Sequence, residues 1–205
     1  MSRFSASRHS FHRKPTPIQA GPVLPSALRR HQETTRRVVE IVEAAKIVEH
    51  LPGPGESVHA LMSGRFDLAL VLAAVLEQQG PAKAHVATLS YNARSFEELC
   101  SLLDRKLLTA CTLLASTFFR SHNEALWEES KAEFAARGQR IAVAYCHAKV
   151  IALDFASGKK LVLEGSANLR SNRNIEQIAI IADHALYSWH AAWIEDYVGR
   201  YTADG

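Results

Sequence analysis

Two side chains suited to phosphate chemistry lie close together late in the chain. His147 and Lys149 are two residues apart at the start of the apolar run VIAL. Side chains two apart on a strand project from the same face, so an imidazole and an ammonium are predicted to share one small site. Asp154 ends the run with the opposite parity, which predicts that its carboxylate points away from that face and supports the site without touching substrate.

A second group of polar residues follows a predicted turn. The segment ASGKK, residues 156–160, is typical of a hairpin turn, and LVLEG, residues 161–165, is predicted to be the returning strand. Residues 165–168, Gly-Ser-Ala-Asn, then form a tight polar turn at the end of this strand. The hairpin therefore brings a hydroxyl and an amide back toward the start of the first strand.

The ordered set of residues resembles the HKD signature of the phospholipase D superfamily. The matching positions are His147, Lys149, Asp154, Gly165, Ser166 and Asn168, and Glu176 stands where many members carry a late acidic residue. The spacer between Asp154 and Gly165 is longer than in the commonly quoted pattern. We assign the extra length to the hairpin, where insertions are well tolerated.

The resemblance implies attack on a phosphodiester without a metal or another cofactor. A neutral His147 would attack phosphorus to give a covalent phosphohistidine, while Lys149, Ser166 and Asn168 would hold the phosphoryl oxygens. Glu176 would accept a hydrogen bond from the far nitrogen of His147 and so fix its tautomer.

One component of this chemistry is missing from a single chain. Members of the family use two H-x-K motifs, one His attacking and the other protonating the leaving group, and only one credible copy exists here. His12 and Lys14 have the same spacing, but Pro15 and Pro17 are incompatible with a central strand, so we interpret that pair as a coincidence. The economical solution is a homodimer that brings two His147 side chains to one shared site, so a monomer is expected to be inactive.

The substrate class is less sharply defined by the sequence. Arg170 and Arg173 follow the Asn168 turn and are either phosphate-binding residues or ordinary surface arginines. The first hypothesis is a phosphodiesterase, most simply a nuclease, that acts on DNA or RNA. The alternatives are a phosphatidyltransferase or phospholipase that acts on lipid phosphodiesters, and a non-hydrolytic module that binds nucleic acid.

Charge is distributed unevenly along the chain. The 205 residues have a net charge of +3, but residues 1–37 contain eight Lys or Arg and one acid, a net +7 that leaves −4 for the remainder. Residues 1–33, rich in Ser, Pro, Arg and His, are predicted to form a disordered basic arm. The arm either contacts nucleic-acid phosphates or serves as a solubilising or targeting tail.

The composition indicates a globular protein in a reducing compartment. Hydrophobic residues make up 47% of the chain, enough for a proper core, and the three cysteines stand singly in apolar segments. No stretch has the length and apolarity of a membrane span or a secretory signal. A cytoplasmic protein without stable membrane association is therefore expected.

The remaining pattern predicts an α/β fold with a mixed β-sheet sandwiched between helices. Residues 34–50 carry apolar side chains at helical spacing and are predicted to form an amphipathic helix before a catalytic domain of residues 55–205. In that domain strands alternate with helices, one of which is expected to be capped by Ser95, and another to open at Ser121 or Asn123 and end at Gly138. The resemblance implies the same fold, a phospholipase D-like half-domain. The aromatic residues of the last helix are predicted to pack in the core or an interface, with a base-stacking platform as the alternative; they are Tyr187, Trp189, Trp193 and Tyr197.

Overall fold

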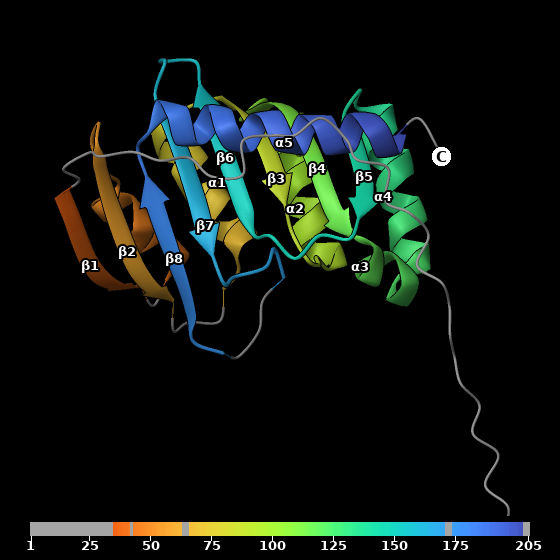
Figure 1. The fold of residues 1–205 in the computed structure, drawn as a ribbon, viewed down its shortest axis with the longest axis horizontal. Coiled ribbons are helices and arrows are strands. Elements are labelled where there is room, and N and C mark those ends of the chain that lie inside the picture. Colours follow the sequence, from red (N-terminus) through yellow and green to blue (C-terminus); the bar gives the residue numbers. More distant parts are fainter. Residues whose placement is uncertain (1–34, 42, 63–65, 171–173, 203–205) are drawn as a thin grey trace, which may run out of the picture.

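A single eight-stranded sheet organises the chain (Figure 1). The computed structural model describes residues 35–41 as backbone only, and residues 43–62, 66–170 and 174–202 in full. The strand order is β1-β2-β8-β7-β6-β3-β4-β5. The strands are β1 (Thr35–Ile41), β2 (Glu56–Met62), β3 (Ala82–Ala87), β4 (Leu108–Ser116), β5 (Arg140–Ala144), β6 (Val150–Phe155), β7 (Lys160–Gly165) and β8 (Glu176–Ile181).

The sheet is mixed, and strand direction decides which residues meet. Strands β3, β4 and β5 are parallel, whereas β6 runs antiparallel to β3, β7 to β6 and β8 to β7. The carboxyl ends of β3, β4, β5 and β7 therefore lie at the same edge as the amino ends of β6 and β8. We call this the carboxyl edge, and it is the lower edge of the sheet in Figure 1.

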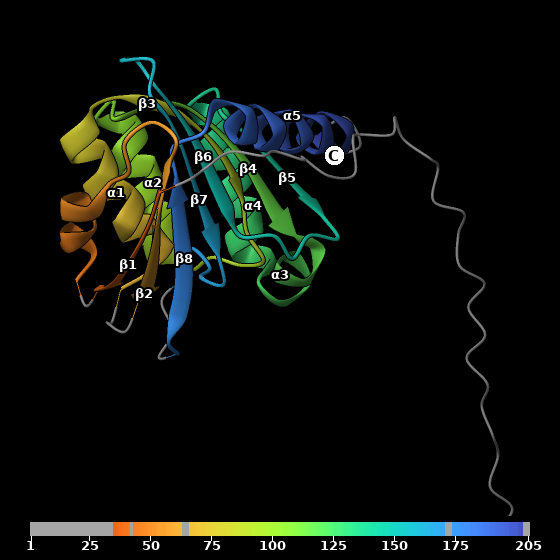
Figure 2. The ribbon, with the colours of Figure 1, turned by 60° about the vertical axis from the view of Figure 1, so that its left-hand side comes forward.

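Helices cover both faces of the sheet, which confirms the predicted α/β sandwich. Figure 2 shows α5 on one side and α1 and α2 on the other. Phe119 of α3 and Trp127 and Phe134 of α4 join the same core cluster as α1 and α2. The helices are α1 (Leu68–Gln79), α2 (Ala93–Asp104), α3 (Thr117–His122), α4 (Glu124–Ala136) and α5 (His184–Thr202).

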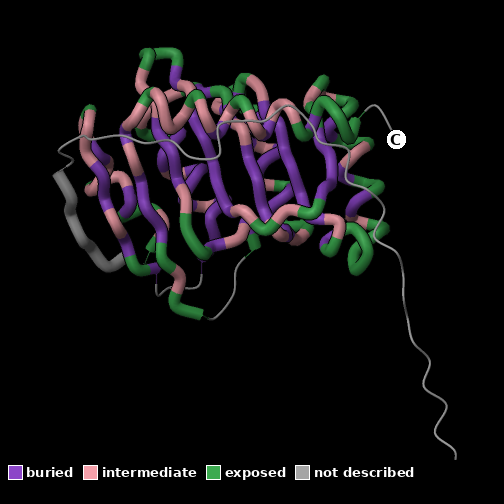
Figure 3. The backbone as a smooth tube through the Cα atoms, in the orientation of Figure 1, coloured by how far each residue is buried: buried purple, intermediate pink, exposed green. Residues whose placement is uncertain are grey.

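Alternating side chains of the central strands supply two cores. In β6, Ile151 and Leu153 join the large cluster under α1 and α2, while Val150 and Ala152 pack on the face that carries α5. Because both faces are covered, the strand is almost continuously apolar, as its sequence indicated. Figure 3 shows the buried backbone concentrated in these strands. The sheet is thus a firm support for the residues at its ends.

The prediction of one helix over residues 34–50 is wrong. Residues 35–41 form strand β1, paired in parallel with β2, and Ala44–His50 form a short 3-10 helix, η1, in which Ile47 is fully buried. Strand β1 therefore belongs to the same sheet as the rest of the domain, and Ile47 of η1 belongs to its core. The physical reason is that β-branched residues such as Val38, Val39 and Ile41 favour a strand wherever a partner is available. The predicted arm, residues 1–33, lies outside the described residues.

Two helix boundaries also differ from the prediction. The N-cap of α2 is Asn92, whose side chain accepts a hydrogen bond of 2.9 Å from Ser95 N, while Ser95 Oγ accepts one of 3.1 Å from Asn92 N. Ser95 is therefore the reciprocal partner in the capping box and not the cap. Ser121 does not open a helix but lies at the end of α3, whereas Asn123 is the N-cap residue of α4, as predicted.

The closing helix α5 is anchored to the sheet by its aromatic side chains. Tyr187 packs against the Val150 cluster and Trp193 against the cluster of Leu114, which agrees with the predicted packing role of these two residues. Tyr197, for which the same role was predicted, is 37% exposed. Asp183 starts the helix by accepting hydrogen bonds from two backbone amides of its first turn. No helix among the described residues has the length and apolarity needed to cross a bilayer.

The capping box makes a testable contribution to stability. Replacing Asn92 with Ala removes the acceptor for Ser95 N, and we expect the free energy of unfolding to fall by about 1 kcal/mol. The matched control is Arg94→Ala in the same turn, where the exposed side chain makes no such contact and a change within about 0.5 kcal/mol is expected. Denaturant unfolding measures both, and equal effects would contradict the capping assignment.

Candidate active site

The connection between β5 and β6 places His147 at the carboxyl edge. Strand β5 is at the end of the sheet and β6 lies beyond β4 and β3, so residues 145–149 must cross the ends of both strands (Figure 1). This short segment begins with a bend at Tyr145, where Cys146 N donates a hydrogen bond of 2.8 Å to the Ala144 carbonyl oxygen, and it belongs to no strand. The His147 side chain is exposed there, so its imidazole is open to a ligand.

Lys149 lies beside His147 and is largely withdrawn from water. The residue is 9% exposed, and its Nζ is 3.2 Å from His147 Nδ1 and 2.9 Å from the His147 carbonyl oxygen. Burial lowers the pKa of the Lys149 amine below its usual value, while electrostatic effects of Cys146 and Glu176 oppose that shift. The imidazole and the ammonium thus share one site, as their spacing predicted.

The contact between these two residues determines the resting tautomer of the ring. An ammonium can only donate, so Nδ1 of His147 accepts from Lys149 and the ring proton of a neutral imidazole is on Nε2. Attack by Nε2 requires the other tautomer. Lys149 must therefore turn from Nδ1 to a ligand oxygen before the ring can act as a nucleophile.

Ser166 and Glu176 form a separate pair at the same edge. Ser166 Oγ donates to Glu176 Oε2 and accepts a hydrogen bond of 3.0 Å from Gln177 N. The predicted hydrogen bond from His147 to Glu176 is not among the described contacts of His147, although Glu176 influences Lys149 electrostatically. In this structure Glu176 therefore orients the Ser166 hydroxyl and faces the lysine charge.

Asn168 lies beside a residue that the sequence did not single out. Thr88, which follows β3 and is 1% exposed, donates a hydrogen bond of 3.0 Å to the Ser90 carbonyl oxygen and accepts one of 3.4 Å from Leu169 N. Its Oγ1 is also 3.5 Å from Asn168 Oδ1. With Oδ1 directed at Thr88, the two Nδ2 donors of Asn168 remain for a ligand. The available sequence signal was a hydroxyl residue directly after an apolar strand.

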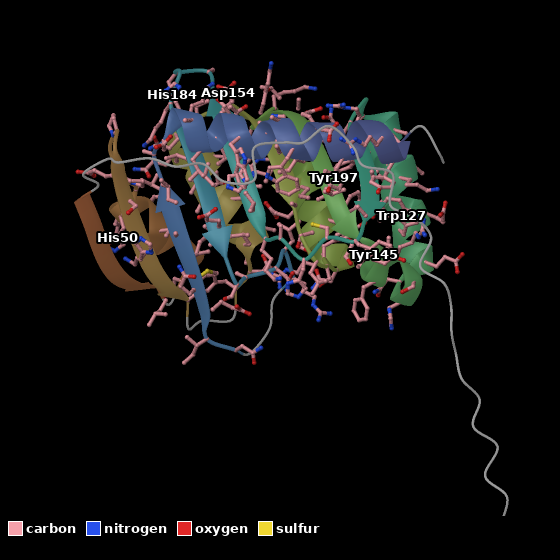
Figure 4. All side chains as sticks on the ribbon, viewed as in Figure 1. His50, Trp127, Tyr145, Asp154, His184 and Tyr197 are labelled. Carbon is pink, nitrogen blue, oxygen red and sulfur yellow. The ribbon has the colours of Figure 1, made fainter. Side chains whose placement is uncertain are left out.

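The other predicted site residues lie in different places. Asp154 is at the far end of β6 from His147, where it forms an ion pair with Lys160 of β7, and Figure 4 shows it and Tyr145 at opposite edges of the sheet. Arg170 is exposed beside Asn168 and Glu176 in a small hollow next to the turn. Arg173 lies outside the described residues.

The carboxyl edge supplies nitrogen donors and hydroxyls suited to anionic oxygens. His147, Lys149 and Asn168 offer nitrogen atoms, and Ser166 offers an oriented hydroxyl. Within the fully described ranges, no three His, Cys, Asp or Glu side chains gather closely enough to hold a metal ion.

Comparisons with solved structures give distant likenesses, which include a chromatin protein and a phospholipase D family member. No protein-family model and no curated protein sequence matches the chain. TrmBL2, an archaeal chromatin protein whose structure shows a novel mode of DNA binding, is 14% identical with a TM-score of 0.48, over 76% of this chain and 56% of its own. Nuc from Salmonella typhimurium, a phospholipase D family member, is 16% identical with a TM-score of 0.46, over 62% of this chain and 83% of its own. At these values the functional interpretation rests on the residues of the site itself.

Close packing at Gly165 gives a test of how the turn is positioned. A Cβ at this residue would lie 2.0 Å from the backbone oxygen of Gln177, so Gly165→Ala must push β7 away from β8. We expect a loss of roughly 1–3 kcal/mol in the free energy of unfolding, because the clash is with backbone.

The control is the same change at a glycine with free space around it. Gly199→Ala lies in α5, where a new Cβ meets nothing within 4 Å, and it is expected to stabilise the protein by roughly 0.5–1 kcal/mol. Thermal and denaturant unfolding measure both variants. Equal stability of Gly165→Ala and the unmodified protein would refute the close approach.

Proposed function

We propose that the chain is a metal-independent phosphodiesterase that cleaves DNA or RNA through a phosphohistidine on His147. The observation that carries the proposal is the exposed imidazole 3.2 Å from a buried ammonium, at an edge that also holds Ser166 and Asn168. These groups provide a nucleophile and donors for phosphoryl oxygens. The order of the same residues in the sequence resembles the phospholipase D signature, which supports the same chemistry.

The reaction would begin when a phosphodiester anion draws Lys149 away from His147. With Nδ1 free, the imidazole exchanges protons with water, so that Nδ1 is protonated and Nε2 has a lone pair. Nε2 then attacks phosphorus, a P–N bond forms, and the bond from phosphorus to the leaving oxygen breaks. The leaving oxygen needs a proton at that moment. In the second half, water attacks phosphorus, the P–N bond breaks, and a base must remove a proton from the water.

A second copy of the chain would supply that acid and base. We propose a homodimer in which a protonated His147 of the partner subunit gives its proton to the leaving oxygen and later takes one from water. Leu61, 47% exposed, and Ile175, 72% exposed, lie at the carboxyl edge and offer apolar surface for a partner to cover. The two-fold axis would then pass close to the site.

Nucleic acid is the favoured substrate because cations flank the site. Arg170 is exposed next to Asn168, and its guanidinium has no hydrogen-bond or ion-pair partner among the described residues. Such a cation is suited to a phosphate neighbouring the one that is cleaved. Arg173 and the basic arm of residues 1–33 would add similar contacts.

Cleavage in the presence of a chelator tests the reaction. Purified protein is incubated in EDTA with a plasmid, an RNA and bis(p-nitrophenyl) phosphate, and turnover is expected to survive chelation. His147→Ala should lower the rate by more than roughly a thousandfold, because it removes the nucleophile. His184→Ala, at an exposed histidine on the opposite edge of the sheet, is the matched control and should retain the full rate (Figure 4).

Three outcomes would count against the proposal. Activity that disappears in EDTA would contradict a metal-independent reaction. Turnover of phosphatidyl lipids with nucleic acids left intact would assign the site to lipid phosphodiesters. Salt-sensitive nucleic-acid binding that is unchanged in His147→Ala, without any turnover, would indicate a binding module.

Mixing of subunits tests the shared site. If each site needs two His147 side chains, a heterodimer of wild type and His147→Ala is inactive, and an equal mixture after subunit exchange should retain about half the activity per wild-type chain. Mixing wild type with His184→Ala should leave the full activity per chain. The molecular mass in solution is measured in parallel, and an active monomer would refute the dimeric site.

A further inference from the structure

A groove opens directly beside the imidazole of His147. It has a volume of about 760 Å³ and is formed by α3, the loop after β3 and the segment that precedes His147. A space of this size accommodates a small-molecule group. Since His147 itself is part of the wall, whatever enters the groove lies next to the atom at which the proposed reaction takes place.

Two aromatic rings at this groove are exposed to solvent. Tyr145 is 100% exposed and stands two residues before His147, and Phe118 of α3 is 57% exposed. Most other aromatic side chains of the domain are packed: Phe119 and Phe134, for example, are at most 1% exposed in the core. Exposed ring faces beside a phosphate-binding site are suited to stacking against nucleobases.

The charges of the groove favour an anionic ligand. Arg120 lines it, and no acidic residue of the described part of the chain does. The Arg120 guanidinium has no hydrogen-bond or ion-pair partner among the described residues. Four other arginines are neutralised by carboxylates: Arg105 by Glu77, Arg137 by Asp104, Arg140 by Glu195 and Arg200 by Asp196. Arg120 is thus available to a phosphate at the groove.

The remaining lining combines short side chains with little aliphatic bulk. Among the described residues, Ser116, Thr117 and Ser121 contribute hydroxyls, and Leu89 is the one leucine, isoleucine or valine in the lining. The Ser116 and Ser121 hydroxyls are already hydrogen-bonded to backbone groups of Phe118. The Arg120 cation and the exposed aromatic faces together match the phosphate and the base face of a nucleotide. A fatty acyl chain in the groove would leave the Arg120 guanidinium without a partner.

We propose that this groove is a subsite for an unpaired nucleobase next to the scissile phosphate, so that the substrate is single-stranded or locally unpaired nucleic acid. The proposal rests on the proposed function and specifies its substrate. In a duplex both faces of a base are covered by its neighbours, so a base can stack on Tyr145 only after it has left the helix. Arg120 on one side of His147 and Arg170 on the other would hold the phosphates of the same strand.

Binding to a cleavage-deficient protein tests the subsite separately from the reaction. In the His147→Ala background, affinity for a fluorescent single-stranded oligonucleotide is measured by anisotropy in EDTA and compared with a duplex of the same sequence. We expect the single strand to bind more tightly. A further Tyr145→Ala change should weaken its binding by about 5- to 150-fold, the effect of losing one stacked base.

Two variants control for other roles of the ring. Tyr145→Phe keeps the aromatic face and should retain the affinity of the parent. Tyr201→Ala removes another exposed tyrosine, 47% exposed near the end of α5, and should leave binding unchanged. Molecular mass is measured for every variant, so that a change in assembly is detected independently.

Any of three results would overturn the subsite. The first is that Tyr145→Ala leaves the affinity for the oligonucleotide unchanged. The others are that the protein binds the duplex more tightly than the single strand, or that it binds phosphatidylglycerol vesicles and not the oligonucleotide. Dissociation of a dimer by Tyr145→Ala would show that a second copy occupies the groove. If the wild-type protein cleaves nucleic acid while Tyr145→Ala binds like its parent, the subsite alone is refuted. If no nucleic acid is cleaved, the proposed function is refuted.

Discussion

The buried ammonium of Lys149, which lacks a carboxylate partner among its described contacts, is the interaction on which the candidate site at the carboxyl edge depends. The ammonium of Lys149 is taken out of water but is met by a carbonyl oxygen and a ring nitrogen of His147, with no carboxylate in direct contact among its described hydrogen bonds and ion pairs. Glu176 stabilises the charge from farther away while it holds the Ser166 hydroxyl. Burial lowers the lysine pKa for this reason, and a bound phosphate would provide the missing negative charge. The same event would free His147 Nδ1, so anion binding and activation of the imidazole are coupled.

Sheet topology explains how the site residues reach one edge. The segment of residues 145–149 must span two strands between β5 and β6, and the hairpin from β6 to β7 returns the Gly165 turn to the same end. Gly165 then allows the turn to approach the β8 backbone so closely that Ser166 can pair with Glu176. Thr88, at the end of β3, lies beside Asn168 and accepts a hydrogen bond from Leu169 N. The polar atoms at this edge are oriented by firmly packed strands, so little reorganisation is needed to meet an anion.

The sequence predicted what depends on local order and missed what depends on distant contacts. The hairpin and the close approach of His147 and Lys149 follow from the spacing of polar residues in apolar runs. In residues 34–50, however, Val38, Val39 and Ile41 satisfy a helical and a strand pattern equally well, and pairing with β2, far along the chain, selects the strand. The sequence also could not show which residue Glu176 contacts, because both Ser166 and His147 are candidates in the sequence pattern. The register of β7 on β8 places Ser166 next to Glu176. Thr88 gave no signal beyond its place after a strand.

The aromatic residues show why periodicity alone did not locate a binding surface. The last helix is rich in aromatic side chains, yet Tyr187 and Trp193 use their faces to hold α5 on the sheet. Tyr145 stands in no periodic pattern, because it belongs to the short crossing before His147, where neither a helix nor a strand covers it. A side chain in such a segment gains nothing from the core, so its ring is available to a ligand. In the proposed function, Arg120 at the groove and Arg170 beside Asn168 would form with that ring a path along the carboxyl edge that suits one strand of nucleic acid better than two.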